Sequence, residues 1–153
     1  MLPKKLQDKI DARASDSSLR TLGLRQDLLD FSSNDYLGFS SSKKMYNKAC
    51  SVLKQHNYQV NGATGSRLLT ANHPLYLDTE KQIATFHKTP SALIFNSGYD
   101  ANIGFFSSVP QRGDVILYDA LCHASIRDGI AMSHAKAYKF THNNLQGLEA
   151  LLE

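Results

Sequence analysis

The stretch that decides the fold is Phe95-Asn-Ser-Gly-Tyr-Asp-Ala-Asn102, read together with Asp119-Ala-Leu-Cys-His-Ala-Ser125. In both places an apolar run that predicts a strand ends, and small or polar residues open a helix. The predicted strands are residues 91–95 and 115–118, and the helices that follow them are 99–109 and 123–132. Two such turns in succession place backbone N–H groups and side chains at the carboxyl edge of a sheet, where open α/β folds bind ligands.

The two turns suit a phosphorylated aromatic ligand. Ser97 and Gly98 lie at a helix N-terminus, where free N–H groups and the helix dipole both favour an anion. His123 opens the neighbouring helix, so its imidazole can lie flat over an aromatic ring whose phosphate sits at the first turn. This combination predicts pyridoxal phosphate as a cofactor. A simpler explanation stays open for each residue, namely that it only caps its own helix.

The rest of the chain alternates helices and strands. Short strands are predicted at residues 28–31 and 137–140, and helices at 3–20, 42–57, 72–87 and from 143 onward. Leu6 and Ile10 lie on one stripe of the first helix. The apolar positions expected to point inward from the second helix are Met45, Ala49, Val52 and Leu53. The alternation predicts an α/β fold with a mainly parallel sheet covered by helices on both faces.

Composition and charge narrow the class of protein. With 42% apolar and 20% charged residues, the 153-residue chain is typical of a soluble globular protein. The net charge of +3 is small and dispersed, which argues against a nucleic-acid partner, and neither a membrane span nor a signal peptide is expected. Cys50, Cys122 and the histidines lack metal-ligand spacing, so we expect no metal and two reduced, buried thiols in a cytoplasmic protein.

Four blocks of sequence resemble the α-oxoamine synthases, which are pyridoxal-phosphate enzymes of the fold-type I aminotransferase superfamily. The blocks stand in the family's order and at its spacing, and the resemblance extends from residue 20 to residue 142. They are Phe31-Ser-Ser-Asn-Asp-Tyr-Leu-Gly38, Gly62-Ala-Thr-Gly-Ser-Arg67, Asn96-Ser-Gly-Tyr-Asp-Ala-Asn102 and Asp119-Ala-Leu-Cys-His-Ala-Ser-Ile-Arg-Asp-Gly129. The resemblance implies the N-terminal segment and part of the large domain of such an enzyme.

The resemblance also implies roles for single residues in cofactor binding. Ser97, Gly98 and Tyr99 match the segment that holds the cofactor phosphate. His123 matches the histidine that stacks on the pyridine ring and lies near the substrate.

Further residues match substrate-binding positions of the family. Arg20 matches an arginine that contacts the acyl substrate, and Asn34 a residue close to the substrate carboxylate. Residues 64–67 match the loop at the active-site entrance, near the interface of a homodimer.

One family feature is missing from this sequence. The Schiff-base lysine, the aspartate at the pyridine nitrogen and further phosphate ligands match positions beyond Glu153, so no catalytic residue is expected within this chain. The expected organisation is an N-terminal helix and short strand over residues 1–40, followed by an incomplete cofactor-binding large domain over 41–153. The chain is therefore expected to be a truncated piece that is inactive alone.

The form of the motifs favours one reaction within the family. It is the condensation of L-alanine with a pimeloyl thioester, of coenzyme A or of a carrier protein, with decarboxylation, in biotin biosynthesis. Family members that use glycine with an acetyl thioester, or serine with palmitoyl thioester, share much of the pattern and remain alternatives. A non-catalytic α/β remnant is another, whereas a dinucleotide-binding domain is disfavoured because no Gly-x-Gly-x-x-Gly follows the first strand.

Overall fold

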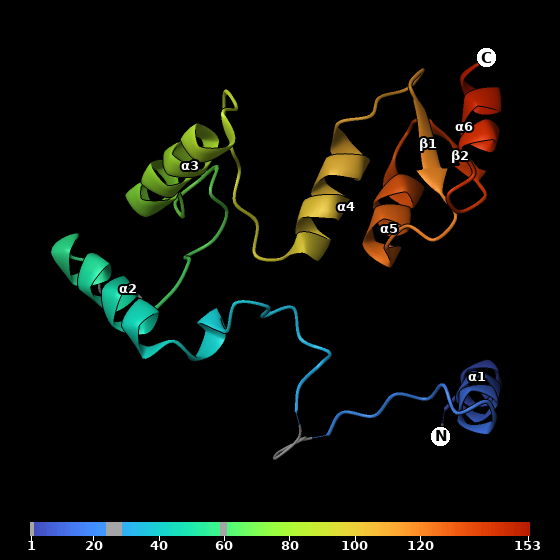
Figure 1. Cartoon of the computed structure of the whole chain (residues 1–153), viewed down its shortest axis with the longest axis horizontal. Helices are drawn as coiled ribbons and strands as arrows, with labels where there is room; N and C mark the ends of the chain where they lie inside the picture. Colours follow the sequence, from blue (N-terminus) through green and yellow to red (C-terminus); the bar gives the residue numbers. More distant parts are fainter. Residues whose placement is uncertain (1, 24–28, 59–60) are drawn as a thin grey trace. The chain divides into compact units, whose positions relative to one another are not determined.

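The chain forms two compact units in the computed structural model, which describes residues 2–23, 29–58 and 61–153 (Figure 1). Unit 1 comprises Met1–Asn61 and unit 2 comprises Gly62–Glu153. The division expected at residue 40, between an N-terminal segment and a large domain, stays a prediction. None of the described helices is long and apolar enough to cross a membrane.

Unit 1 contains the helix α1 (Lys4–Ser15), the 3-10 turn η1 (Phe39–Ser41) and the helix α2 (Lys43–Gln55). Helix α2 lies within the range 42–57 predicted for it, and Ser42 caps it, because Ser42 Oγ accepts a hydrogen bond from the N–H of Met45. Helix α1 ends before residue 20, where the sequence predicted its end. Ser17 takes a left-handed conformation with φ of 59°, and the next two N–H groups bond back to the carbonyl oxygen of Arg13, which closes the helix.

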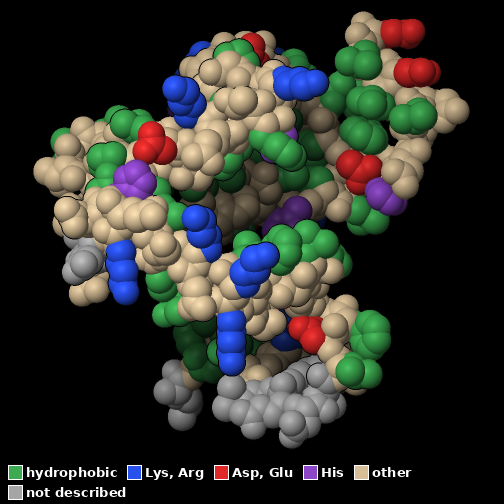
Figure 2. Space-filling view, turned by 60° about the vertical axis from the view of Figure 1, so that its left-hand side comes forward, with side chains coloured by type: hydrophobic (Ala, Val, Ile, Leu, Met, Phe, Trp, Pro, Cys, Tyr) green, Lys and Arg blue, Asp and Glu red, His purple; other side chains and the backbone are tan. Residues whose placement is uncertain are grey.

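The apolar stripes of α1 and α2 are largely exposed, although the stripe of α2 was expected to point inward. Neither helix contains a buried residue, and Leu6 and Met45 keep 49% and 48% of their surface exposed. Within the described part of unit 1, no second helix or strand packs extensively on either stripe. Hydrophobic side chains accordingly reach the surface in the space-filling view (Figure 2).

The strand predicted at residues 28–31 does not form over the described residues 29–31, and Leu28 lies outside the described residues. Asp30 instead closes a turn with its own side chain, because its carboxylate accepts hydrogen bonds from the N–H groups of Ser32 and Ser33. Aspartate makes such local bonds in place of a strand ladder. These bonds to the charged form also lower the pKa of Asp30, the bond from Ser32 being the main cause.

Unit 2 carries most of the predicted elements. They are α3 (Pro74–His87), α4 (Gly98–Ser108), β1 (Val115–Asp119), α5 (Ala124–Met132), β2 (Lys136–Phe140) and α6 (Leu145–Leu152). β1 and β2 pair in parallel, with Val115 opposite Lys136 and Asp119 opposite Phe140. The predicted parallel α/β arrangement is therefore confirmed in this unit, with α4 and α5 packed together and α6 against β2 (Figure 1).

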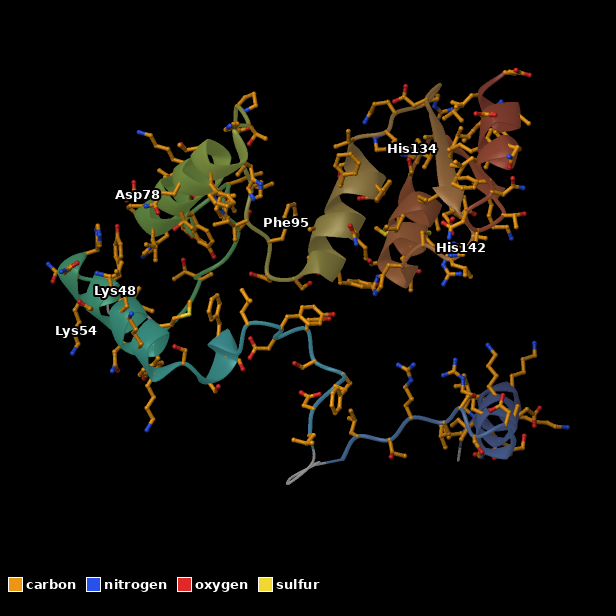
Figure 3. All side chains as sticks on the ribbon, viewed as in Figure 1. Lys48, Lys54, Asp78, Phe95, His134 and His142 are labelled. Atoms are coloured by element: carbon orange, nitrogen blue, oxygen red, sulfur yellow. The ribbon has the colours of Figure 1, made fainter. Side chains whose placement is uncertain are left out.

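Residues 91–95 do not form the predicted strand. β1 and β2 pair only with each other in the described residues, so this segment has no neighbouring strand. Its backbone is bonded elsewhere, because the N–H of Ile94 donates to Glu80 Oε1 over 2.9 Å. Phe95 packs on α4, where a Cβ added to Gly104 would lie 3.0 Å from the Phe95 ring (Figure 3).

Helices α4 and α5 approach each other most closely at Gly129. A Cβ at this position would lie 2.9 Å from Phe106 Cβ and 3.0 Å from the carbonyl oxygen of Asn102, so only glycine fits. The neighbouring Ile130 is buried, as is Ile116 of β1, and these residues form the core beside the two helices. The two cysteines, Cys50 and Cys122, are free but only half-buried, so the expectation that they are buried is wrong.

Candidate functional site

The N-terminus of α4 carries two backbone N–H groups that are free to bind an anion. Ser97 caps the helix, because its Oγ accepts a hydrogen bond from the N–H of Asp100 over 3.0 Å. The N–H groups of Gly98 and Tyr99 have no hydrogen-bond partner among the described residues. A Cβ added to Gly98 would meet nothing within 4 Å, so the space in front of this turn is open. Free donors at a helix N-terminus are suited to a phosphate group.

His123 caps α5 through one face of its imidazole. Nδ1 accepts a hydrogen bond from the N–H of Ser125 over 3.2 Å and lies 2.7 Å from the hydroxyl oxygen of the same residue. The cap uses Nδ1 alone, and Nε2 makes no hydrogen bond within the described residues. The residue is exposed. Capping and ligand binding are therefore compatible for His123, because they use different parts of the ring.

A buried hydroxyl connects the cap of α5 to α4. Ser125 is fully buried, and its Oγ accepts a hydrogen bond from Asn102 Nδ2 over 2.9 Å. Neither residue was predicted to take part in the site. The available signal was that Asn102 closes the same block that holds Ser97, five residues further along.

The hydroxyl of Tyr99 is already occupied. It donates a hydrogen bond to Asp128 Oδ2 of α5 over 2.9 Å. This bond to the carboxylate is the main reason that the pKa of Tyr99 is raised. At Tyr99 the backbone N–H, and not the side-chain hydroxyl, is therefore available to a phosphate.

The carboxyl edge of the two strands is held together by Asp119. Its carboxylate accepts hydrogen bonds from the N–H groups of Leu121 and Asn143 and lies 2.9 Å from Nδ1 of His142, which is labelled in Figure 3. The bond from Leu121 is the main cause of the lowered pKa of Asp119, and His142 adds to it. The cluster ties the turn after β1 to the turn after β2, and so steadies the loop that leads to His123.

Two of the predicted substrate-binding residues, Arg20 and Asn34, belong to unit 1, and their part in a site stays a prediction. Both are exposed. Arg20 lies beyond Ser15, so it is not at the end of α1 as expected. The residue that organises the turn after Asn34 is Asp35, whose carboxylate accepts from the N–H of Phe39.

The loop that contains residues 64–67 is anchored by Arg67. Its guanidinium makes two hydrogen bonds to the carboxylate of Glu80, of 2.7 and 3.0 Å, and lies 4.3 Å from the ring centre of Tyr76. It also donates to Asn72 Oδ1. Arg67 therefore holds the loop on α3, and the role of residues 64–67 at an active-site entrance stays a prediction.

Comparison with known proteins gives the family. Residues 26–153 match the sequence model described as aminotransferase class I and II. The chain belongs to this family. Its order of elements and its parallel strands agree with the fold-type I transferases, which confirms the fold expected from the resemblance.

Among curated proteins, this aminotransferase-family chain is similar to the 8-amino-7-oxononanoate synthase of Emericella nidulans, with 46% identity over 82% of this chain and 31% of the relative. Among solved structures it is similar to serine palmitoyltransferase of Sphingomonas wittichii, with 31% identity, a TM-score of 0.67, and coverage of 75% and 28% of the two chains. The fold also matches serine palmitoyltransferase of S. paucimobilis with a bound PLP-myriocin aldimine, with a TM-score of 0.78, 21% identity, and coverage of 97% and 42%.

The chain spans about a third of the length of the curated relatives that it matches, 31% in the first case. All of its lysines lie in α1, α2, α3, the residue that ends α3, and β2. None of them follows the carboxyl end of a strand.

Proposed function

We propose that this chain is the N-terminal part of a pyridoxal-phosphate-dependent acyltransferase that makes 8-amino-7-oxononanoate. The substrates would be L-alanine and a pimeloyl thioester of coenzyme A or a carrier protein. The reaction would release carbon dioxide and the free thiol of the donor, and the amino ketone formed would serve biotin biosynthesis. The whole enzyme would be a cytoplasmic homodimer.

The observation that carries the proposal is the pair of helix starts in unit 2. The free N–H groups of Gly98 and Tyr99, beside the cap residue Ser97, fit a phosphate, and the space in front of Gly98 is open. His123 begins the adjacent helix with an exposed ring whose Nε2 is unused among the described residues. An anion site next to an exposed imidazole fits a phosphorylated aromatic cofactor.

The residues of this chain would bind and orient, while other residues would transfer protons. Bound pyridoxal phosphate supplies an electron sink that stabilises the carbanion formed at the Cα of an amino acid. The first turn of α4 would hold its phosphate, and His123 would cover the face of its ring. Arg20 would contact the acyl substrate, and Asn34 the amino-acid carboxylate. The lysine that carries the cofactor would lie outside this chain, because no lysine here follows the carboxyl end of a strand.

The substrate assignment rests on the relatives. Curated relatives with 46% and 44% identity are named 8-amino-7-oxononanoate synthase, or putatively so, which favours L-alanine and a pimeloyl thioester. The structural likeness to serine palmitoyltransferases keeps L-serine and palmitoyl-coenzyme A as the second candidate.

The test uses the complete product of the gene that encodes this chain, with any codons beyond Glu153. The purified protein is loaded with pyridoxal phosphate and given three substrate pairs: L-alanine with pimeloyl-coenzyme A, glycine with acetyl-coenzyme A, and L-serine with palmitoyl-coenzyme A. Release of coenzyme A is measured for each pair. We expect the first pair to react fastest and the gene to rescue a biotin auxotroph.

Two results would overturn the proposal in different ways. Faster reaction of the second or third pair, without rescue, would move the protein to another α-oxoamine synthase activity. A complete gene product that binds no pyridoxal phosphate would remove the enzyme assignment and leave a non-catalytic α/β protein.

A further inference from the structure

We propose that Asn102 and Ser125 are positioning residues that fix the proton of His123 on Nε2. The proposal concerns the chain Asn102–Ser125–His123, which runs from α4 through the buried hydroxyl to the cap of α5. The role of this hydrogen-bond chain, which is to present a defined N–H at the exposed edge of the ring, rests on the proposed function. The hydrogen-bond directions themselves follow from the structure.

The direction of each bond follows from the one donor that cannot change. The backbone N–H of Ser125 is only a donor, so Nδ1 of His123, 3.2 Å away, must be an acceptor. An acceptor Nδ1 carries no proton, so the contact of 2.7 Å with Ser125 Oγ must be donated by the hydroxyl. Once its proton is donated to Nδ1, the hydroxyl oxygen can only accept further hydrogen bonds. This agrees with the bond that it accepts from Asn102 Nδ2.

The proton of the neutral imidazole must therefore be on Nε2. This nitrogen has no hydrogen-bond partner among the described residues, and the residue is exposed. The ring thus offers one fixed donor toward the space where the cofactor and the substrate would bind. Because Ser125 is fully buried and lies between two helices that meet at Gly129, the chain is held by packing as well as by hydrogen bonds.

The test is ¹⁵N NMR of the complete gene product labelled only in histidine, without cofactor. His123 is assigned by the signals lost in His123→Asn. At a pH where the ring is neutral, we expect Nε2 to show the shift of a protonated nitrogen and Nδ1 that of an unprotonated one. The opposite assignment in the unsubstituted protein would overturn the proposal, and this measurement needs no variant in the network.

Variants show what the two side chains add, because the backbone N–H of Ser125, which already requires an acceptor at Nδ1, is kept in all of them. Asn102→Asp replaces a donor by a group of the same shape that only accepts, so the Ser125 hydroxyl should turn toward the new carboxylate and away from Nδ1. Ser125→Ala removes the hydroxyl, and Ser125→Thr keeps it. We expect the His123 shifts to change in the first two variants and to stay close to the unsubstituted values in Ser125→Thr.

The matched control is Asn144→Asp, which adds the same charge at the cap of α6 and keeps an acceptor for the N–H of Gly147. It should leave the His123 shifts unchanged. Unchanged shifts in both Asn102→Asp and Ser125→Ala would overturn the proposal.

Turnover gives a second readout in the loaded enzyme. We expect kcat/KM for amino acid to fall about ten- to a hundredfold in Ser125→Ala, the range found when a supporting hydrogen bond is removed from a metal-binding histidine, and to recover in Ser125→Thr. Cofactor affinity should be kept, because the turn at Ser97 is untouched. If the protein binds no cofactor, the proposed function fails. The NMR measurement without cofactor still decides which nitrogen of His123 carries the proton.

Discussion

Arg67 and Glu80 form a two-bonded ion pair that fastens the loop before α3 to that helix, with N–O distances of 2.7 and 3.0 Å. Glu80 also accepts the N–H of Ile94, so one carboxylate holds two segments that have no strand partners. The bond from Arg67, followed by the bond from Ile94, lowers the pKa of Glu80 from 4.5 to about 2. The stability of unit 2 at acidic pH should therefore depend on whether the Glu80 carboxylate is charged.

The acid stability of the protein should depend on Glu80. Its pKa in the folded protein is lower than its ordinary value, so the stabilisation is complete above pH 4.5 and is lost as the pH falls toward about 2. Glu80→Gln removes this contribution, and we expect the difference in Tm between the two proteins to shrink over that range. The measurement is thermal unfolding of both proteins between pH 2 and pH 7, and a constant difference in Tm would contradict the prediction.

Gly129 should be far less tolerant of a methyl group than Gly104. In Gly129→Ala the new Cβ meets backbone at 3.0 Å, and overpacking of about 1–3 kcal/mol outweighs the gain of about 1 kcal/mol in helix propensity. Gly104→Ala is the matched control in α4, because its new Cβ meets only the ring of Phe95, which can rotate. Chemical denaturation should show a net loss for Gly129→Ala and little or none for Gly104→Ala; equal losses would refute this account of the helix contact.

His123 should act through its ring as well as through its cap. His123→Ala loses both, with a stability loss of about 1 kcal/mol, whereas His123→Asn keeps a capping oxygen and loses only the ring. If the ring covers the cofactor, turnover falls about ten- to a thousandfold in both variants. Normal turnover in His123→Asn, with stability restored, would show that His123 only caps α5. Tm and the rate of condensation are measured on the same preparations of the complete gene product.

Tyr99 should contribute its backbone and not its hydroxyl to phosphate binding. Tyr99→Phe removes the bond to Asp128 and should lower stability, while the affinity for pyridoxal phosphate stays within about twofold, because the backbone N–H groups remain. Fluorescence titration with the cofactor measures this affinity. A large loss of affinity at unchanged stability would mean that the hydroxyl leaves Asp128 and contacts the ligand.

The 153-residue chain by itself should form no selective covalent bond between the cofactor and one of its lysines. Its lysines lie in helices, at the end of α3 or within β2, and none is placed at the end of a strand beside His123. Incubation with pyridoxal phosphate, borohydride reduction and peptide mass spectrometry should find no single lysine modified in preference to the others. Selective and complete labelling of one lysine would show that this segment carries its own cofactor lysine.

The sequence by itself determined the elements whose signals are local. The caps at Ser42, Ser97 and Asn144 depend on side chains that each bond to the N–H group three residues further along, so the chain carries that information within one turn. The cap residue Ser97 and the residues with free N–H groups, Gly98 and Tyr99, were therefore found together in the block of residues 96–102. The family followed for the same reason, because its motifs are such turns.

The tertiary structure alone decided which polar groups meet. The sequence of residues 91–95 predicts a strand, yet a strand also needs a neighbouring strand for its hydrogen bonds. The N–H of Ile94 donates to the Glu80 carboxylate instead. The apolar stripe of α2 predicted burial, but burial depends on a second surface that packs on the stripe. The bond from Asn102 to Ser125 spans 23 residues and exists because Gly129 lets α4 and α5 approach, and no local pattern records such a distance.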